Sequence, residues 1–553
     1  MRRPRWLAAG VIPLTAALAI TSCSSGDEGG GEEPGAGAGD PAKNESVEIT
    51  VFGSEPSRPL VPGDTSETGG GKIVDALFTG LMDYDPVSGE AREAHAESFE
   101  LTSPTEYTVK LKKGWTFHDG TEVKAHNYID AWNYTAYSPN GQQHASFMTQ
   151  IKGFADVHTP DPDGPDAPQQ PATPKAKEMS GLVEVNDYEF KIQFTEPHAI
   201  FKVKTGYAAF MPMPDSFFAD PETWKKTPVG NGAFKYVARV PDQELQIERF
   251  DEYEGADKPK IKKVKFVFTD ADAAYAAVKG NQLDFMDTAP PQAIAGNVWE
   301  TDLPGRAKAY PVMAVQTMSF PVYDPKYQNV DFRHAVSMAI DREAVTKTIF
   351  EGNREPLSGY GMDLVPGYED GACGKWCEFN PDEAKKLFAK SGWTGPIQIT
   401  SNADNGHKEW IEAVCGSIQE TLGVECTFEP VPQFSQVRQA IEAREMDQLY
   451  RSGWLADYPL IENFLNPIYR TGGSSNDNGY SNPEVDAKLA AADKAETEEE
   501  AYQLYHEAEE LIAEDMPAVP LWNTPSISCW SERLTNVRLT PKRELDLSYV
   551  EVK

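Results

Sequence analysis

The chain has 553 residues, of which 40% are hydrophobic and 25% are charged. At roughly 100 to 200 residues per domain, this length predicts about three domains, each with a core of its own, and excludes a small disulfide-stapled module. Lys and Arg number 51 against 86 Asp and Glu, a net charge of -35. Such a chain repels phosphate backbones and anionic membrane surfaces, so we expect no nucleic-acid partner.

The N-terminus has the pattern of an export signal. Arg2, Arg3 and Arg5 precede an apolar stretch over 6–20, which is shorter than the ~20 residues that cross a bilayer as a helix. The stretch ends in Ile20-Thr21-Ser22-Cys23, which is similar to the bacterial lipobox, where cleavage precedes a cysteine that carries diacylglycerol. The alternative is a cysteine at the end of an ordinary secretory leader. We predict a signal peptide over 1–22 and a lipid on Cys23 that anchors an extracytoplasmic protein to the cell membrane.

Residues 23–45 are predicted to be a flexible acidic tether. This stretch is rich in Gly, Glu, Ala, Asp and Pro and has no apolar period. It therefore cannot bury enough surface to order itself.

Strand and helix patterns then alternate along the chain. Period-two patterns predict strands over 47–51, 107–111, 188–194 and 264–268. Helical spacing begins at Ile73, and clearer helices with N-terminal signals are predicted over 380–392 and 501–512. Interleaved strands and helices indicate a mixed α/β class.

Five cysteines follow Cys23, and four of them form close pairs. In an exported protein, close pairs are more often disulfides than metal ligands, and no neighbouring His completes a zinc set. We predict that Cys373 pairs with Cys377 and Cys415 with Cys426. Cys529 is left over and is expected to be buried as a small apolar residue.

The usual catalytic patterns are missing from the sequence. Gly69-Gly70-Gly71-Lys72 is followed by Ile73 instead of the Ser or Thr of a phosphate loop. No His-Glu-x-x-His and no Gly-x-Ser-x-Gly pattern occurs, and the nine His residues do not cluster. We therefore expect a binding protein without a cofactor or metal, not an enzyme.

Six segments carry a resemblance to a known family. They are, in chain order, Val74–Asp85, Tyr107–Thr121 with its Phe117-His118-Asp119-Gly120, Pro228–Phe234, Phe332–Arg342, Phe379–Lys385 and Gly453–Tyr458. Together they resemble the family 5 solute-binding proteins of ABC importers, the peptide- and oligopeptide-binding class. The resemblance extends over residues 47–553.

The resemblance implies a two-lobed periplasmic-binding-protein type II (cluster C) fold with an extra domain inserted in the first lobe. Lobe I would hold residues 46–80, 200–315 and 520–553, the inserted domain 81–199, and lobe II 316–519. Hinges would lie near Val315 and Leu521, and such binders close on ligand between their lobes. A monomer is expected.

A free peptide is a zwitterion, so a site that encloses it must meet an ammonium and a carboxylate with opposite charges. In peptide binders of the family, the acid of the Gly-Trp-x-Ala-Asp-Tyr segment holds the α-amino group, and that position is Asp457 here. The alternative for Asp457 is a cap on the turn that follows.

Further ligand contacts are carried over from the family. Arg451 would meet the ligand carboxylate, and its spacing puts it on the same face as Asp457 if the strand is unbroken; a surface salt bridge is the alternative. Trp454 would line the cleft or pack within the lobe. Thr65, Ser66, Glu67 and Thr68 begin a loop, ending at Gly71, whose backbone would pair with the peptide as a strand.

The resemblance implies a receptor that captures peptides outside the cell and delivers them to a membrane permease driven by ATPase subunits. The chain departs from the family after Tyr458, where Pro459-Leu460-Ile461-Glu462 replaces the usual acid and Pro. An oligosaccharide or metal chelate is therefore the alternative ligand, and an extracellular hydrolase is the third hypothesis.

Overall fold

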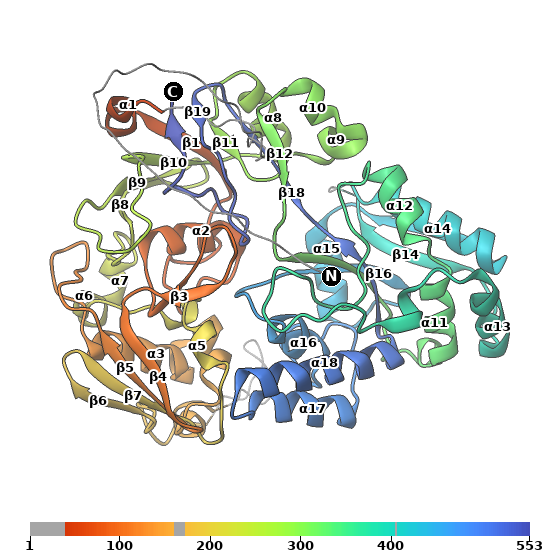
Figure 1. Ribbon diagram of the computed structural model, residues 1–553, viewed down its shortest axis with the longest axis horizontal. Coiled ribbons are helices and arrows are strands. Elements are labelled where there is room, and N and C mark those ends of the chain that lie inside the picture. The colour runs from red at the N-terminus through yellow and green to blue at the C-terminus, as the bar shows by residue number, and fades with distance from the viewer. Residues whose placement is uncertain (1–38, 160–171, 404–405) are drawn as a thin grey trace, which may run out of the picture.

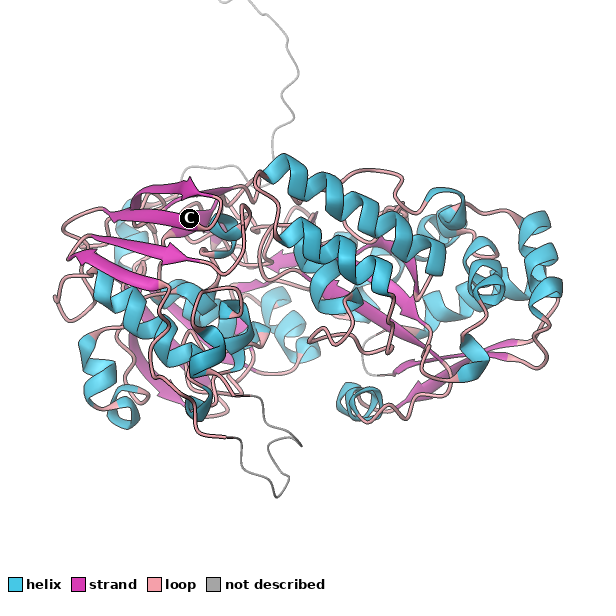
Figure 2. Ribbon diagram, turned by 90° about the horizontal axis from the view of Figure 1, so that it is seen from below, coloured by secondary structure: helices cyan, strands magenta, loops and turns pink. Residues whose placement is uncertain are grey.

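The computed structural model describes residues 39–159, 172–403 and 406–553. The predicted signal peptide, Cys23 and the tether up to residue 38 lie outside the described residues. The rest forms two lobes, and both mix helices with strands (Figures 1 and 2). The predicted two-lobed α/β fold is confirmed.

The first lobe is built on a seven-stranded sheet. Its central strand β1 runs parallel to β10 and β11, and the alternation of the sequence buries Ile49 and Val51. Across the sheet the order is β12 (Ala307–Tyr310), β18 (Ser526–Trp530), β11 (Phe285–Met286), β1 (Glu48–Gly53), β10 (Lys263–Phe268), β9 (Glu244–Arg249) and β8 (Phe234–Val240). The remaining elements of this lobe are α2 (Thr68–Leu77), α8 (Ala271–Lys279), α9 (Pro291–Ile294), η4 (Ala295–Asn297), α10 (Val298–Asp302), β19 (Leu534–Thr535) and β20 (Glu551–Val552).

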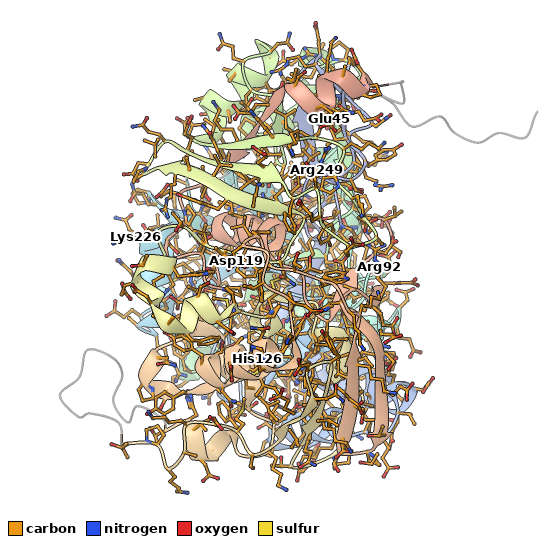
Figure 3. The ribbon with its side chains drawn as sticks, turned by 90° about the vertical axis from the view of Figure 1, so that its left-hand side faces the viewer. Glu45, Arg92, Asp119, His126, Lys226 and Arg249 are labelled. Atoms are coloured by element: carbon orange, nitrogen blue, oxygen red, sulfur yellow. A yellow bond between two sulfur atoms is a disulfide. The ribbon has the colours of Figure 1, made fainter. Side chains whose placement is uncertain are left out.

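The chain is already ordered before residue 46, so the predicted tether is too long. Pro41–Ser46 forms helix α1, and the buried Asn44 accepts a hydrogen bond from the Val552 backbone N–H of β20 at 2.8 Å. Glu45 pairs with Arg249 at 2.7 Å (Figure 3). Composition missed this helix because its contacts come from residues more than 200 positions away.

The inserted region carries a four-stranded antiparallel sheet and the hairpin β2–β3. Trp132 of α3 donates its indole N–H to the Phe210 carbonyl at 2.9 Å, so the segment after residue 199 packs on this region. The sheet order is β4 (Ala96–Ser103), β5 (Glu106–Leu111), β7 (Glu189–Gln193) and β6 (Leu182–Asn186). The other elements are β2 (Met82–Tyr84), β3 (Ala91–Glu93), α3 (Ala125–Ala136), η1 (Ser138–Asn140), η2 (Gln143–Met148), α4 (Phe154–Val157), α5 (Phe201–Lys204), η3 (Ala208–Phe210), α6 (Asp215–Ala219) and α7 (Pro221–Trp224).

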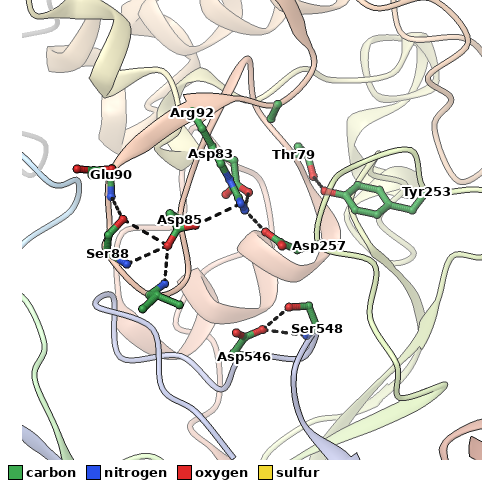
Figure 4. Close-up of polar contacts among 12 residues, drawn as sticks. Thr79, Asp83, Asp85, Ser88, Glu90, Arg92, Tyr253, Asp257, Asp546 and Ser548 are labelled. Carbon is green, nitrogen blue, oxygen red and sulfur yellow. Dashed lines mark hydrogen bonds and ion pairs between the residues drawn. The ribbon is translucent and has the colours of Figure 1, made fainter. Parts of the chain in front are cut away.

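Ion pairs tie the hairpin to the first lobe. Arg92 of β3 pairs with Asp83 at 3.0 Å, with Asp85 at 3.6 Å and with Asp257, which lies between β9 and β10 (Figure 4). The inserted region and lobe I also share one continuous hydrophobic core. They therefore form a single packed unit.

The second lobe has a five-stranded sheet with a separate core. Its order is β15 (Cys426–Val431), β14 (Ile397–Asn402), β16 (Leu449–Leu455), β13 (Ala314–Ser319) and β17 (Ala518–Asn523). Its helices are η5 (Pro325–Tyr327), α11 (Val330–Met338), α12 (Arg342–Ile349), η6 (Gly374–Cys377), α13 (Pro381–Ser391), α14 (Lys408–Leu422), α15 (Phe434–Glu442), α16 (Glu462–Tyr469), α17 (Pro483–Asp493) and α18 (Glu498–Asp515).

The chain crosses between the lobes twice, at residues 311–313 and 524–525. These positions lie a few residues from the predicted boundaries at 315 and 520. The boundaries shift because β13 begins at Ala314 and β17 continues to Asn523, and the two strands pair with each other in the second sheet. The two crossings therefore lie side by side, as a hinge requires.

Candidate ligand-binding site

Strand β16 presents an open edge at the boundary between the lobes. It pairs with β13 from Tyr450 to Leu455, but its pairing with β14 covers only Leu449 and Tyr450. Over residues 451–455, no described strand pairs with the edge of β16 that faces away from β13. An edge of this kind can accept an extended peptide as an added strand.

Asp457 lies two residues beyond the end of β16 and is held by Asn463 of α16. The Asn463 Oδ1 accepts hydrogen bonds from the Asp457 backbone N–H and from the Trp454 indole N–H, both at 2.9 Å. Its Nδ2 donates to the Asp457 carboxylate at 3.1 Å. One buried amide thus positions both predicted ligand residues.

The Asp457 carboxylate also contacts the first lobe through a hydrogen bond from Tyr207. Burial raises the pKa of Asp457 above its ordinary value, and the hydrogen bonds from Asn463 and Tyr207 oppose that rise. A cation that enters the site therefore stabilises the ionised Asp457 carboxylate, because its charge offsets the cost of desolvation. The neighbouring Glu462 has such a cation already in Lys204, at 3.1 Å.

Arg451 belongs to a cationic cluster with Arg354 and His407. The three line one cavity between the lobes, and the Arg451 Nε–H donates to the Gln316 side-chain oxygen at 3.4 Å. Burial lowers the pKa of Arg451 to about 10; burial and the Arg451 charge lower that of Arg354 to about 9. No acidic side chain in the described ranges pairs with either arginine, so the surface salt bridge is not formed.

His407 adds a neutral donor to this cluster. Its Nδ1 accepts a hydrogen bond from the Trp410 indole N–H at 3.1 Å, which leaves the proton on Nε2. Burial and the two arginines lower the pKa of His407 to about 3. The buried Nε2 has no hydrogen-bond partner among the residues that the structure describes. The cluster is therefore suited to an anion that accepts hydrogen bonds from all three side chains.

Trp454 does not share a face with Arg451. In the β13–β16 ladder, Trp454 pairs with Val315 and Arg451 with Met318, so the two side chains point to opposite sides of the sheet. Asp457 is bonded through Asn463 to Trp454, and the strand ends at Leu455. The common face of Arg451 and Asp457 is expected only for an unbroken strand, and because the strand ends before Asp457 that condition is not met.

The loop predicted to pair with a peptide has another structure. Thr68–Gly71 forms the first turn of α2, and the Glu67 side chain caps it by accepting a hydrogen bond from the Gly70 N–H at 2.6 Å. Buried Thr65 donates its hydroxyl to the Pro59 carbonyl, while Ser66 is exposed. A helical turn cannot supply strand hydrogen bonds, so residues 68–71 do not pair with a peptide in this way. Backbone pairing by residues 65–67, and ligand contact by Thr65, Ser66, Glu67 or Thr68, stay predictions.

The sulfur atoms of both predicted cysteine pairs lie at disulfide distance, 2.05 Å for Cys373 and Cys377 and 2.19 Å for Cys415 and Cys426. Cys529 is buried, as expected. Within the described ranges, no group of three His, Cys, Asp or Glu side chains could hold a metal ion. None of the described helices is both long enough and apolar enough to cross a membrane.

Arg354, His407 and Asn463 were not predicted as site residues. Arg354 follows α12, His407 precedes α14, and Asn463 lies in α16. None of the three belongs to a motif, and only the packing of these helices around β16 brings them together.

Known proteins are similar to this chain in sequence and in fold. The oligopeptide-binding protein OppA of Bacillus subtilis is 23% identical over 527 residues, 92% of this chain and 93% of its own. The periplasmic OppA of Salmonella typhimurium is 25% identical over 463 residues, 81% of each chain. The murein tripeptide binding protein MppA of Escherichia coli has a TM-score of 0.73 at 20% identity, over 91% of this chain and 98% of its own.

A family model assigns the chain. The model described as bacterial extracellular solute-binding proteins, family 5 Middle, matches residues 90–476. This range contains the inserted region from β3 onward, the first crossing between the lobes, Arg451 and Asp457. The chain belongs to the family 5 bacterial extracellular solute-binding proteins.

Proposed function

We propose that this protein is an extracytoplasmic receptor that captures peptides between its lobes and delivers them to a membrane permease with ATPase subunits. The observation that carries the proposal is the open edge of β16, with a carboxylate near one end and a cationic cluster at the other. The relatives add support: the OppA of Haemophilus influenzae was solved in complex with the peptide RPPGFSPFR.

Each end of the peptide has a counterpart in this arrangement. The ligand ammonium pairs with Asp457, while Asn463 keeps the carboxylate in place. The ligand carboxylate accepts hydrogen bonds from Arg354, His407 and Arg451. Backbone groups of the ligand pair with the open edge over 451–455, a mode that tolerates many side chains. Rotation about the two crossings then encloses the ligand between the lobes.

Replacement of Asp457 tests the anchor for the ammonium. In Asp457→Asn, we expect the affinity for trialanine to fall by about 3 to 5 kcal/mol, because a buried ion pair loses one partner. Isothermal titration calorimetry measures the change, and Asp363→Asn, at an exposed position of the same lobe, is the matched control.

N-acetylated trialanine separates the alternatives. The wild-type protein should bind acetylated trialanine as weakly as Asp457→Asn binds free trialanine, because both complexes lack the ion pair between Asp457 and the peptide ammonium. Equal affinity for free and acetylated peptide would refute the anchor. Binding of an oligosaccharide or metal chelate in place of peptides would favour the alternative ligand class.

We further propose that the protein is a monomer, that Cys23 carries the lipid anchor and that both cysteine pairs are oxidised. The sequence before Cys23 and the sulfur distances support the last two. Mass spectrometry of protein from the membrane fraction, with and without reduction, should show a diacylated N-terminal Cys23 and a gain of four hydrogens on reduction. An unmodified N-terminus, or free thiols at Cys373, Cys377, Cys415 and Cys426 before reduction, would contradict the respective proposal.

A further inference from the structure

A second cavity lies on the face of the second sheet opposite the cationic cluster. It encloses about 330 Å³ between the β13–β16 ladder and α15, the helix beside β14. The residues that matter most are Thr317, Ser452 and Trp454 from the sheet and Phe434, Val437 and Ile441 from α15. An engineered apolar cavity of ~150 Å³ is large enough to take up benzene. This cavity has room for a ring.

The part of the lining that α15 provides is mainly apolar. Val437 and Ile441 are 3% and 4% exposed and form a small hydrophobic cluster with Met446 and Tyr450, separate from the main core of the lobe. Of the three charged residues at the cavity, Arg438 and Asp477 pair with each other at 2.6 Å. The third, Arg451, also lines the cationic cavity, where it is proposed to meet the ligand carboxylate. The paired charges therefore do not call for a charged ligand group.

The cavity adjoins the open edge of β16. Ser452 and Trp454 of β16 point toward the apolar cavity. Arg451 lies between the apolar cavity and the cationic cavity and lines both. Successive side chains of an extended peptide point to opposite faces of the sheet that it joins. A peptide on this edge consequently directs one side chain to the apolar cavity and the next toward the opposite face.

We propose that the cavity beside α15 receives an aromatic or branched aliphatic side chain of the bound peptide and so makes the receptor selective for an apolar residue at one ligand position. The inference rests on the proposed function and concerns the ligand side chain, whereas Asp457 and the cationic cluster recognise the ligand ends. The affinity gained by burying such a side chain is about 10- to 150-fold.

A peptide series tests this selectivity on the wild-type protein. The probes are trialanine, its three single-Phe variants and the corresponding Leu and Lys variants, measured by isothermal titration calorimetry. We expect Phe or Leu to tighten binding by at least about tenfold at one position only. Lys at that same position should give no gain.

Two variants assign the gain to this cavity. Val437→Phe places a ring in the cavity from α15, away from the edge that pairs with the peptide, and should abolish the gain from Phe while trialanine still binds. Phe434→Ala removes a half-exposed lining residue and should reduce the gain several-fold. Gln439→Phe adds the same ring at an exposed position of α15 and is the matched control. Thermal unfolding of each variant verifies that it is folded.

The outcomes separate this inference from the proposed function. If trialanine binds but Phe gives no gain at any position, or if the gain persists in both Val437→Phe and Phe434→Ala, the apolar subsite is refuted and peptide capture stands. If no member of the series binds to the folded wild-type protein, peptide capture is refuted, and the subsite with it.

Discussion

The two faces of the second sheet differ sharply where β16 leaves its neighbour β14. On one face, Arg354, His407 and Arg451 gather positive charge and hydrogen-bond donors around a cavity. On the other, α15 covers an apolar cavity lined by Val437 and Ile441. A single strand serves both, because its successive side chains point to opposite sides.

Neighbouring parts of one site can have opposite effects on the stability of the fold. The cationic face holds two arginines whose pKa values are lowered by burial, so their charges are poorly solvated and no described acid offsets them. The apolar face buries Val437 and Ile441, which stabilises the fold. We expect ligand binding to stabilise the cationic face, whereas the apolar face is stable without ligand.

The largest expected effect is on the apolar face. Ile441→Ala should lower the free energy of unfolding by about 2 to 5 kcal/mol, because it enlarges an existing cavity and removes buried methyl groups. Urea denaturation measures this loss, and the exposed Gln439→Ala should change stability by less than about 0.5 kcal/mol. A loss no greater than that of the control would mean that α15 does not pack as described.

Arg451→Met should have opposite effects on stability and on binding. Without ligand, melting should occur at the same or a higher temperature, since a poorly solvated cation beside Arg354 is removed. Affinity for trialanine should fall by about 1.5 to 3 kcal/mol, the value of a hydrogen bond to a charged group.

Arg438→Met gives the contrast, because Arg438 is paired with Asp477. Its removal leaves an acid without its partner and should lower the melting temperature without weakening trialanine binding. A lower melting temperature for Arg451→Met than for Arg438→Met would reverse the comparison between the two faces.

The smallest effect is the pH dependence of binding. The pKa of Asp457 is raised by burial, so the ionised carboxylate, which is proposed to bind the ligand ammonium, is lost at a higher pH than for an ordinary aspartate. Affinity for trialanine should fall with decreasing pH, by at most about tenfold per pH unit. His407, with a pKa of about 3, stays mostly neutral down to pH 4 and contributes little. Titrations from pH 7, where the peptide amine is mostly protonated, down to pH 4 should show the fall in the wild type and no such fall in Asp457→Asn; a fall in both would assign it to another group.

Much of the fold was predictable because its signals are local. The alternation over 107–111 became β5, and Asn380 caps α13 as predicted, with its side chain accepting from the Glu383 N–H at 3.1 Å. The family motifs also located the segment that contains Arg451 and Asp457. Such patterns succeed where neighbours in the chain decide the structure, as in a strand, a cap or a short motif.

The sequence by itself determined the fold class, the family and the position of the acid at 457. Only the tertiary structure decided that Asn463 holds this acid, that Arg354 and His407 join Arg451, and that Thr68–Gly71 is helical. It also decided that α1 is ordered and that an apolar cavity lies behind Trp454. The physical reason is that periodicity reports the neighbours within an element, whereas contacts between distant segments depend on strand register and on the packing of helices around the sheet.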